Sequence, residues 1–233
     1  MKALKPYHGV TLQLVFELYI SALIMAVVYW LVGTLIFDSP LNFKQCLILT
    51  SVLGFVIVGA YQLFFWTEYN NTKFEKKVFH IPLDDKIPFI SNFIWIYSLS
   101  YYAIIGLVII TVPSIEKGME YIFGGLVLLT VQCIIFYFIP STVPESWRKY
   151  HIESKSARFL KLVQRFDVGR NCMPSMHMSV AMYVSLLLFP ILSYYSFIFV
   201  LIIGISCLFV KQHVLLDLLP GIALGWLVHT IVL

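Results

Sequence analysis

The chain of 233 residues carries little charge. Charged residues make up 12% of it, whereas a soluble globular domain carries roughly 25%. Hydrophobic residues make up 60%, and the mean hydropathy is +0.89. This composition leaves too little polar surface to keep a globule of this length in water. It excludes an ordinary soluble domain and favours a bilayer as the solvent.

The patterns of two other protein classes are also missing. The four cysteines form no C-x-x-C pair, so zinc sites and thioredoxin-like redox chemistry have little support. No long basic run occurs, and the formal net charge of +4 suits anionic lipid headgroups better than nucleic acid. No internal repeat or low-complexity tract divides the sequence. We therefore expect a single membrane domain over residues 1–233, with no nucleic-acid partner.

Long apolar runs are what the sequence has instead. A helix needs about 20 apolar residues to cross the hydrocarbon core, and seven stretches are long enough. They are residues 12–36, 45–66, 88–112, 119–139, 174–192, 194–212 and 214–233. A β-barrel would show weak alternating segments, so we predict an all-α, polytopic membrane helical bundle with six to seven transmembrane helices. The first run has no clear small-residue cleavage site, so we interpret it as an uncleaved span.

Lysine and arginine are divided unevenly between the two sides of this bundle. If all seven stretches span, one side holds the N-terminus, loops 67–87 and 140–173 and the junction 211–213, with fourteen of the sixteen cations. The positive-inside rule makes that side cytoplasmic. The same topology places two polar patches, residues 170–177 and 211–217, on this one side, because the two spans between them run out and back.

The second patch places His213 and Asp217 four positions apart. On a helix these residues share a face, with Cβ atoms about 5–6 Å apart. A carboxylate bonded to one ring nitrogen fixes the tautomer of the histidine and raises its basicity, and the other nitrogen is then free to attack or to take a proton. Lys211 supplies a cation near the start of the last span. Ionisable groups beside membrane-length segments indicate a functional site.

The first patch has the pattern of an anion site. Pro174 suits the first helical turn, so Ser175 and His177 are expected at a helix N-terminus, where free N–H groups and the helix dipole bind phosphate. The hydroxyl of Ser175 can donate a hydrogen bond, and Arg170 can bind an anionic oxygen bidentately. Two imidazoles around an anion site suit phosphoryl transfer, where positioning and charge neutralisation do most of the catalysis.

Both patches resemble motifs of a known family. Residues 174–177, Pro-Ser-Met-His, are similar to the second motif of the type 2 phosphatidic acid phosphatase superfamily, and His213-x-x-x-Asp217 is similar to its third. Within that superfamily, residues 166–171 and 211–213 resemble the inositol phosphorylceramide synthase-like branch. The resemblance is specific over about residues 165–225 and looser upstream.

The resemblance implies a role for each candidate residue. His213 resembles the nucleophile that forms a phosphohistidine, Asp217 the residue that orients it, and His177 the acid that protonates the leaving oxygen. Ser175 resembles a phosphate ligand. The implied activity is that of an integral-membrane lipid phosphatase or phosphotransferase, acting on a lipid phosphate or phosphodiester headgroup without a metal or another cofactor.

The sequence departs from the common pattern at two cations. The usual first motif, a lysine followed after six residues by Arg-Pro, is absent, because the chain has no Arg-Pro. The third motif commonly begins Ser-Arg, and here Ser206 precedes Cys207. We predict that Arg170 and Lys211 bind phosphate in place of these cations, which favours the transferase-like branch. The family usually places its site outside the cytoplasm, contrary to the cation count, so the side of the membrane stays open.

Two other functions could use the same residues. A transporter or channel would use the polar patches as a gate, although the stretches 119–139 and 194–210 offer few polar residues for a path. A haem or metal protein would use His177 and His213 as ligands, with Asp217 supporting one of them. A visible spectrum or a metal analysis of the purified protein separates the second alternative from phosphoryl transfer.

Overall fold

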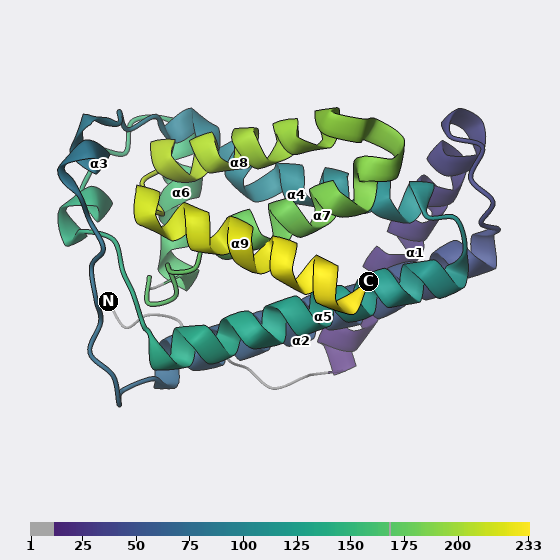
Figure 1. Cartoon of the computed structure of the whole chain (residues 1–233), viewed down its shortest axis with the longest axis horizontal. Helices are drawn as coiled ribbons and strands as arrows, with labels where there is room; N and C mark the ends of the chain where they lie inside the picture. Colours follow the sequence, from purple (N-terminus) through teal and green to yellow (C-terminus); the bar gives the residue numbers. More distant parts are fainter. Residues whose placement is uncertain (1–11, 168) are drawn as a thin grey trace.

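Figure 1 shows the computed structural model, in which long helices run side by side. The structure describes residues 12–167 and 169–233. The α-helices are α1 (Leu12–Ile36), α2 (Phe43–Asn70), α3 (Pro82–Lys86), α4 (Ile94–Thr111), α5 (Ile115–Phe138), α6 (Lys155–Phe166), α7 (Met176–Leu192), α8 (Ile198–Phe209) and α9 (Leu215–Val232). Short 3-10 turns are η1 (Ser91–Phe93), η2 (Glu145–Arg148) and η3 (Ser193–Phe197). The described residues contain no β-strand, and the predicted all-α bundle is confirmed.

Within these described residues, six helical windows are long and apolar enough to cross a membrane. The longest, Met176–Phe209, has 34 residues and reverses at Ser193, whose φ is 48°. Figure 1 shows the two arms, α7 and α8, lying side by side. The 12 residues of α8 make about 18 Å of helix, which is less than the roughly 30 Å of a hydrocarbon core. The chain is a multi-pass integral membrane protein, and its predicted fifth and sixth spans form this hairpin.

Some predicted boundaries were wrong. The third span does not begin at residue 88, because the chain is extended there and Ile90 donates its backbone N–H to Phe209 at 2.9 Å, so the helix starts only at η1. The sixth span ends at Phe209 rather than at residue 212, because residues 210–213 form a turn in which Lys211 has a φ of 56°. Both differences lie at the end of the bundle that holds the histidine patches.

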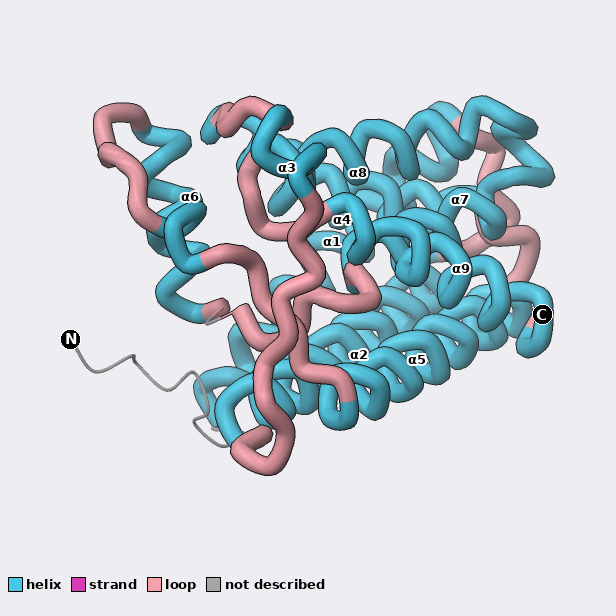
Figure 2. The backbone as a smooth tube through the Cα atoms, turned by 60° about the vertical axis from the view of Figure 1, so that its left-hand side comes forward, coloured by secondary structure: helices cyan, strands magenta, loops and turns pink. Residues whose placement is uncertain are grey.

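The polar connections gather at one end of the bundle, as Figure 2 shows. Loops 71–81, 139–154, 169–175 and 210–214 meet there, together with α3. Both predicted patches therefore lie at the same end, as the out-and-back topology required. Two parts of the predictions lie outside the described residues: the segment 1–11 with its two lysines, and Val168 within the stretch 166–171.

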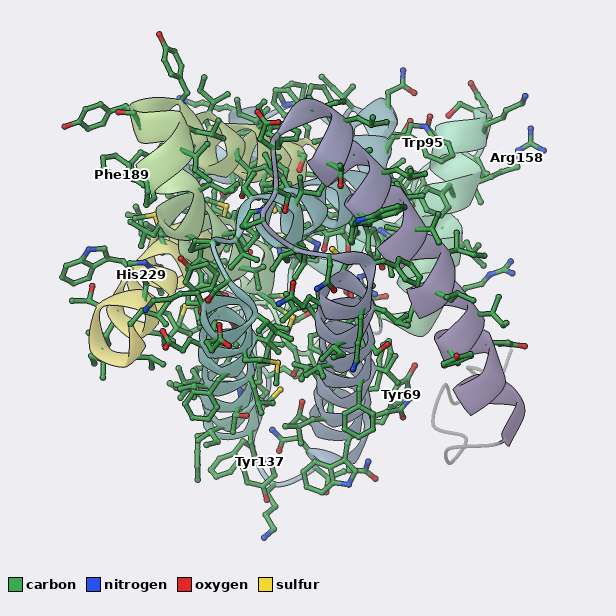
Figure 3. The ribbon with its side chains drawn as sticks, turned by 90° about the vertical axis from the view of Figure 1, so that its right-hand side faces the viewer. Tyr69, Trp95, Tyr137, Arg158, Phe189 and His229 are labelled. Atoms are coloured by element: carbon green, nitrogen blue, oxygen red, sulfur yellow. The ribbon has the colours of Figure 1, made fainter. Side chains whose placement is uncertain are left out.

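Helix α6 crosses this end instead of running along the bundle (Figure 2). Its Leu160 is fully buried, whereas Arg158 and Arg165 are exposed, and Figure 3 shows Arg158 pointing away from the other helices. Trp95 of α4 stacks on Phe159 with 4.8 Å between ring centroids. An apolar face toward the protein and a cationic face outward are typical of a helix at the membrane interface.

Helices α7 and α9 pack closely because α9 presents glycines to α7. A Cβ atom added at Gly221 would lie 2.6 Å from the carbonyl oxygen of Ser175, and one at Gly225 would overlap the carbonyl of Ser179. Any other residue would force the two backbones apart. The two glycines therefore set the distance between the helices whose first turns carry the histidine patches.

Candidate active site

The second patch forms the start of α9. Asp217 is in the first turn of this helix, and its Oδ2 accepts the backbone N–H of Val214 at 3.0 Å. The same oxygen lies 3.4 Å from Nδ1 of His213. Both side chains are buried, with 1% of Asp217 and 5% of His213 exposed. The predicted pairing of His213 with Asp217 is therefore present, and it leaves Nε2 as the ring nitrogen without a carboxylate partner.

The first patch forms the start of α7. Ser175 is the N-cap of this helix, and its Oγ accepts the backbone N–H of Met178 at 3.4 Å. Its own backbone N–H donates to the carbonyl of Asp217 at 2.9 Å. The starts of α7 and α9 are therefore hydrogen-bonded to each other. The imidazoles of His177 and His213 consequently approach to 5.9 Å between ring centroids, inclined by 61°.

Two tyrosines of α4 hold His177. The ring of Tyr97 stacks on the imidazole at 3.9 Å between centroids, with an interplanar angle of 19°. The ring of Tyr101 meets the same imidazole edge to face at 5.1 Å, and its hydroxyl donates to the backbone carbonyl of His177. The sequence analysis missed both tyrosines, because their approach to His177 depends on how α4 packs against α7.

The end of α2 holds the segment before α7. Oε1 of Glu68 accepts the backbone N–H of Gly169 at 2.6 Å, and Thr67 accepts from the Asn171 amide at 3.1 Å. Gly169 has a φ of 70°, the left-handed region that favours glycine. Glu68 is fully buried at the end of a membrane helix, where an unpaired carboxylate would be costly. These bonds fix the approach to α7.

Gln132 of α5 supports the same turn from the other side. Its Nε2 donates to the carbonyl of Pro174 at 2.6 Å, and its Oε1 accepts from the hydroxyl of Ser179 at 2.5 Å. Gln132 is fully buried in a membrane helix, where both halves of an amide need partners. A lone glutamine in an apolar run is the sequence signal that indicates this role.

Asp84 anchors the second patch. One carboxylate oxygen accepts the backbone N–H of Leu215 at 2.8 Å and the other accepts that of Ile81 at 2.9 Å. Its backbone carbonyl accepts from Nζ of Lys211 at 2.7 Å. Asp84 is fully buried, so α3 and the start of α9 are bound through one side chain. In the sequence Asp84 lies in the loop 67–87, and no motif distinguishes it there.

The two predicted phosphate-binding cations are bonded to the protein. Lys211 donates to Asp84 and lies over the ring of Trp147 at 4.3 Å, and its burial lowers the pKa of its ammonium group. A guanidinium nitrogen of Arg170 donates to the carbonyl of Asn71 at 2.5 Å. Of the described residues that line the cavity beside the histidines, none is a lysine or arginine. The binding of phosphate by these two cations remains a prediction.

Two cysteines lie beside the patches. Burial raises the pKa of the Cys172 thiol well above its usual range, so this residue remains a neutral thiol. Cys207 stands where the common third motif has an arginine, and it is buried against Ser175. A small apolar side chain therefore fills the place of that cation, and α7 and α8 can pack together there.

A cavity of about 660 Å³ opens beside the histidine pair. His177, His213, Gln212, Asn171 and Asp167 line its polar end, and the wall beyond them is largely apolar. Gln212 is buried, and its Nε2 has no hydrogen-bond partner among the described residues. Among those same residues, no three His, Cys, Asp or Glu side chains converge as a metal site.

The arrangement therefore joins two histidines, one of them paired with a carboxylate, to an apolar cavity in a membrane bundle. A family model described as the PAP2 superfamily matches residues 72–231. The chain belongs to the PAP2 superfamily. Membership places it among phosphatase-like membrane enzymes and agrees with a membrane lipid as its substrate. No curated protein and no solved structure gives a significant match. The matched model does not distinguish the branches of the superfamily.

Proposed function

We propose that this PAP2 protein is a lipid phosphatase or phosphotransferase that works through a phosphohistidine at His213. One observation carries the proposal: the pair formed by His213 and Asp217 faces His177 at the polar end of an apolar cavity. A nucleophile oriented by a carboxylate, a second imidazole within reach of the same phosphorus and an apolar compartment for the lipid are what phosphoryl transfer from a lipid needs.

In the first step, Nε2 of His213 attacks the phosphorus of the lipid headgroup. The N–P bond forms as the bond from phosphorus to the leaving oxygen breaks, and a protonated His177 gives that oxygen its proton. Asp217 stabilises the positive charge on the His213 ring through Nδ1. In the second step, His177 takes a proton from the acceptor, whose oxygen displaces His213 from phosphorus. Water as acceptor gives a phosphatase, and a lipid alcohol gives a transferase.

The non-bridging oxygens of the phosphate need donors and positive charge. We assign them to the first turn of α7 and to Ser175, with Arg170 and Lys211 contributing positive charge. Ser175 is fully buried and does not line the cavity, so direct contact with phosphate would require its side chain to turn. We add Gln212 as a further donor, because this residue lines the cavity and its buried Nε2 has no hydrogen-bond partner among the described residues. Arg170 and Lys211 are bonded to backbone carbonyls, so direct contact with phosphate would require these bonds to exchange.

The transferase-like branch is favoured by what replaces the usual cations. A cysteine stands at position 207, and the Arg-Pro of the first motif is absent. Fewer fixed charges around phosphorus suit a phosphodiester, which carries one negative charge, better than a phosphate monoester with nearly two. The resemblance of residues 166–171 and 211–213 to inositol phosphorylceramide synthases points the same way.

The direct test incubates the purified protein with a panel of lipid phosphates and lipid phosphodiesters and identifies the products by mass spectrometry. We expect headgroup release or transfer by the wild type with chelator present, inhibition by orthovanadate, and no product from His213→Ala. His229→Ala is the matched control, because His229 is a partly buried histidine near the far end of the same helix. Equal turnover by His213→Ala, or loss of turnover with chelator that a divalent ion restores, would overturn the mechanism.

The same preparation tests the haem and metal alternative. A haem band in the visible spectrum, or a stoichiometric metal that His213→Ala releases, would favour ligation by the histidines over phosphoryl transfer. A transporter would require a polar path, and the cavity wall away from the histidines is largely apolar.

A further inference from the structure

The cavity is far deeper than a headgroup needs. Its wall runs along α4 from Tyr97, beside His177, to Val112, the residue that follows the helix at the opposite end of the bundle. These two residues are fifteen positions apart, which is about 22 Å along a helix. On α5 the wall reaches Gly118, at the start of that helix. The cavity therefore extends from the histidines through most of the membrane-spanning part of the bundle.

The chemistry of the wall changes along this depth. Charged and amide side chains line only the end that holds the histidines. Farther in, α2, α4, α5 and α7 supply leucine, isoleucine, valine and aromatic side chains, and the polar atoms among them are tyrosine hydroxyls and Ser98. Such a wall suits a hydrocarbon chain attached to a polar headgroup and offers little to a free polar solute.

Part of the cavity wall is also exposed. Tyr61 of α2 and Leu99 and Tyr102 of α4 line the cavity, and they are 46%, 50% and 52% exposed. The side chains of Tyr61 and Tyr102 are hydrogen-bonded to each other, so α2 and α4 are joined at this point of the wall.

The cavity is long enough for a lipid chain. A hydrocarbon core of about 30 Å holds two leaflets, so one lipid chain occupies roughly 15 Å of depth, and the cavity is longer than that. Its volume of about 660 Å³ leaves room for a hydrocarbon chain along this length.

We propose that this cavity binds one long hydrocarbon chain of the lipid substrate and that its depth selects the length of that chain. The proposal rests on the proposed function for the identity of the headgroup. The ligand class is a single-chain lipid phosphate, or a two-chain lipid that inserts one chain. The wall then determines specificity, and the histidines determine the chemistry.

Gly125 of α5 is the residue that can test the depth. It lines the cavity, and a Cβ atom added there would meet no other atom within 4 Å, so a larger side chain would project into open space. Gly125 is seven positions from Gly118, so Gly125→Leu would block about the last 10 Å of the cavity. Gly59 of α2 gives the matched control, because it also has open space at Cβ and is exposed outside the cavity.

The first experiment compares Gly125→Leu and Gly59→Leu on lipid phosphates of graded chain length. We expect the wild type and Gly59→Leu to share one chain-length optimum. Gly125→Leu should shift the optimum to shorter chains and lower the long-to-short ratio of kcat/KM about tenfold or more, since discrimination in an apolar pocket reaches 10–200-fold per methylene. An unchanged ratio in a well-folded Gly125→Leu protein would overturn the chain-length role.

The second experiment measures occupancy without turnover. A long-chain alcohol with a terminal diazirine carries no phosphate, and mass spectrometry locates where it attaches after illumination. We expect labels near Val112 and Ile122 in the wild type and in Gly59→Leu, and their loss in Gly125→Leu. These labels in a protein without phosphatase or transferase activity would leave the cavity proposal standing and overturn the proposed function. Turnover with no label in the cavity wall would overturn the cavity proposal and leave the proposed function standing.

Discussion

The two sides of the site are built differently. On one side, the starts of α7 and α9 are joined by a backbone hydrogen bond between Ser175 and Asp217, and Gly221 brings the helices into close contact. On the other side, α2, α4 and α5 stand around an open cavity with a largely apolar wall. The first side fixes the reacting groups, and the second leaves room for the part of the substrate that does not react.

This difference has an energetic basis. A polar group in a membrane bundle is costly without a partner, and Gln132 beside the first patch has two, the carbonyl of Pro174 and the hydroxyl of Ser179. An apolar wall has no such requirement and can enclose empty space next to the bilayer. Substitutions should therefore damage chemistry on the first side and selectivity on the second.

His213→Ala should have the largest effect. The change removes the proposed nucleophile and should reduce turnover by about 10⁴-fold or more, as loss of a nucleophile does in other enzymes. The measurement is product release from the best lipid of the panel, with the elution profile in detergent as the folding control. Turnover within tenfold of the wild type would show that the starts of α7 and α9 do not hold the reacting groups.

His177→Ala should cause the second-largest loss of turnover. Loss of a general acid costs about 10²–10⁴-fold, and the loss should be greatest for substrates with poor leaving groups. Comparing an aryl phosphate with a lipid phosphate ester measures this dependence, because the aryl oxygen leaves without needing a proton. Equal losses on both substrates would assign His177 a packing role beside Tyr97 instead.

Asp217→Asn should cost somewhat less, about 10²–10³-fold in kcat. The serine protease counterpart of this change costs about 10⁴-fold, and a site at the membrane interface has some access to water. The asparagine keeps the size of Asp217 and can still accept the N–H of Val214, but it removes the charge next to Nδ1 of His213. An unchanged melting temperature with reduced kcat supports the orienting role. Near-normal kcat would remove the basis for His213 as nucleophile.

Gln212→Leu should have a moderate effect. A hydrogen bond to a charged oxygen contributes about 1.5–3 kcal/mol, so kcat/KM should fall roughly 10–100-fold with little change in folding. Leucine has nearly the same size and lacks the Nε2 donor, which has no hydrogen-bond partner among the described residues. If kcat/KM stays at the wild-type value, the amide does not bind the headgroup.

The smallest expected effects are on stability, in a comparison of two glycine substitutions. Gly221→Ala should lower stability by about 1–3 kcal/mol, because its Cβ would press on the carbonyl of Ser175 and separate α7 from α9. Gly125→Ala should be neutral or slightly stabilising, since its Cβ meets no atom and alanine suits a helix better. Melting temperatures in detergent decide between them. Equal shifts would contradict the contrast between a tightly packed side and an open side.

Much of the fold and the centre of the site could be predicted from the sequence. The apolar runs indicated the membrane helices, because length and hydropathy alone determine whether a helix can span. The spacing of His213 and Asp217 predicted their pairing, but its geometry differs from the expected one: His213 lies in the turn before α9 and reaches Asp217 in the first turn of that helix, so the two residues do not share a helix face. The meeting of His177 with His213 followed from topology, because two spans out and back return the chain to the same end.

The rest depended on tertiary packing. Tyr97 and Gln132 lie in apolar runs that are far from both patches in sequence, and only the approach of α4 and α5 to α7 gives them a role. Arg170 and Lys211 were predicted from charge, but backbone carbonyls compete for their donors, and the sequence does not show which partner they bond. The cavity could not be predicted, because hydropathy cannot distinguish an apolar side chain that packs from one that lines a space.

The central claim is that His213 carries the phosphoryl group. The measurement is to quench the protein during turnover of a lipid phosphate under alkaline conditions, which preserve phosphohistidine, and to locate the added phosphoryl mass by peptide mass spectrometry. The account predicts one acid-labile phosphoryl group on His213, absent from His213→Ala and slower to form in His177→Ala. A phosphoryl group on any other residue, or steady turnover with no labelled His213 at any time, would contradict it.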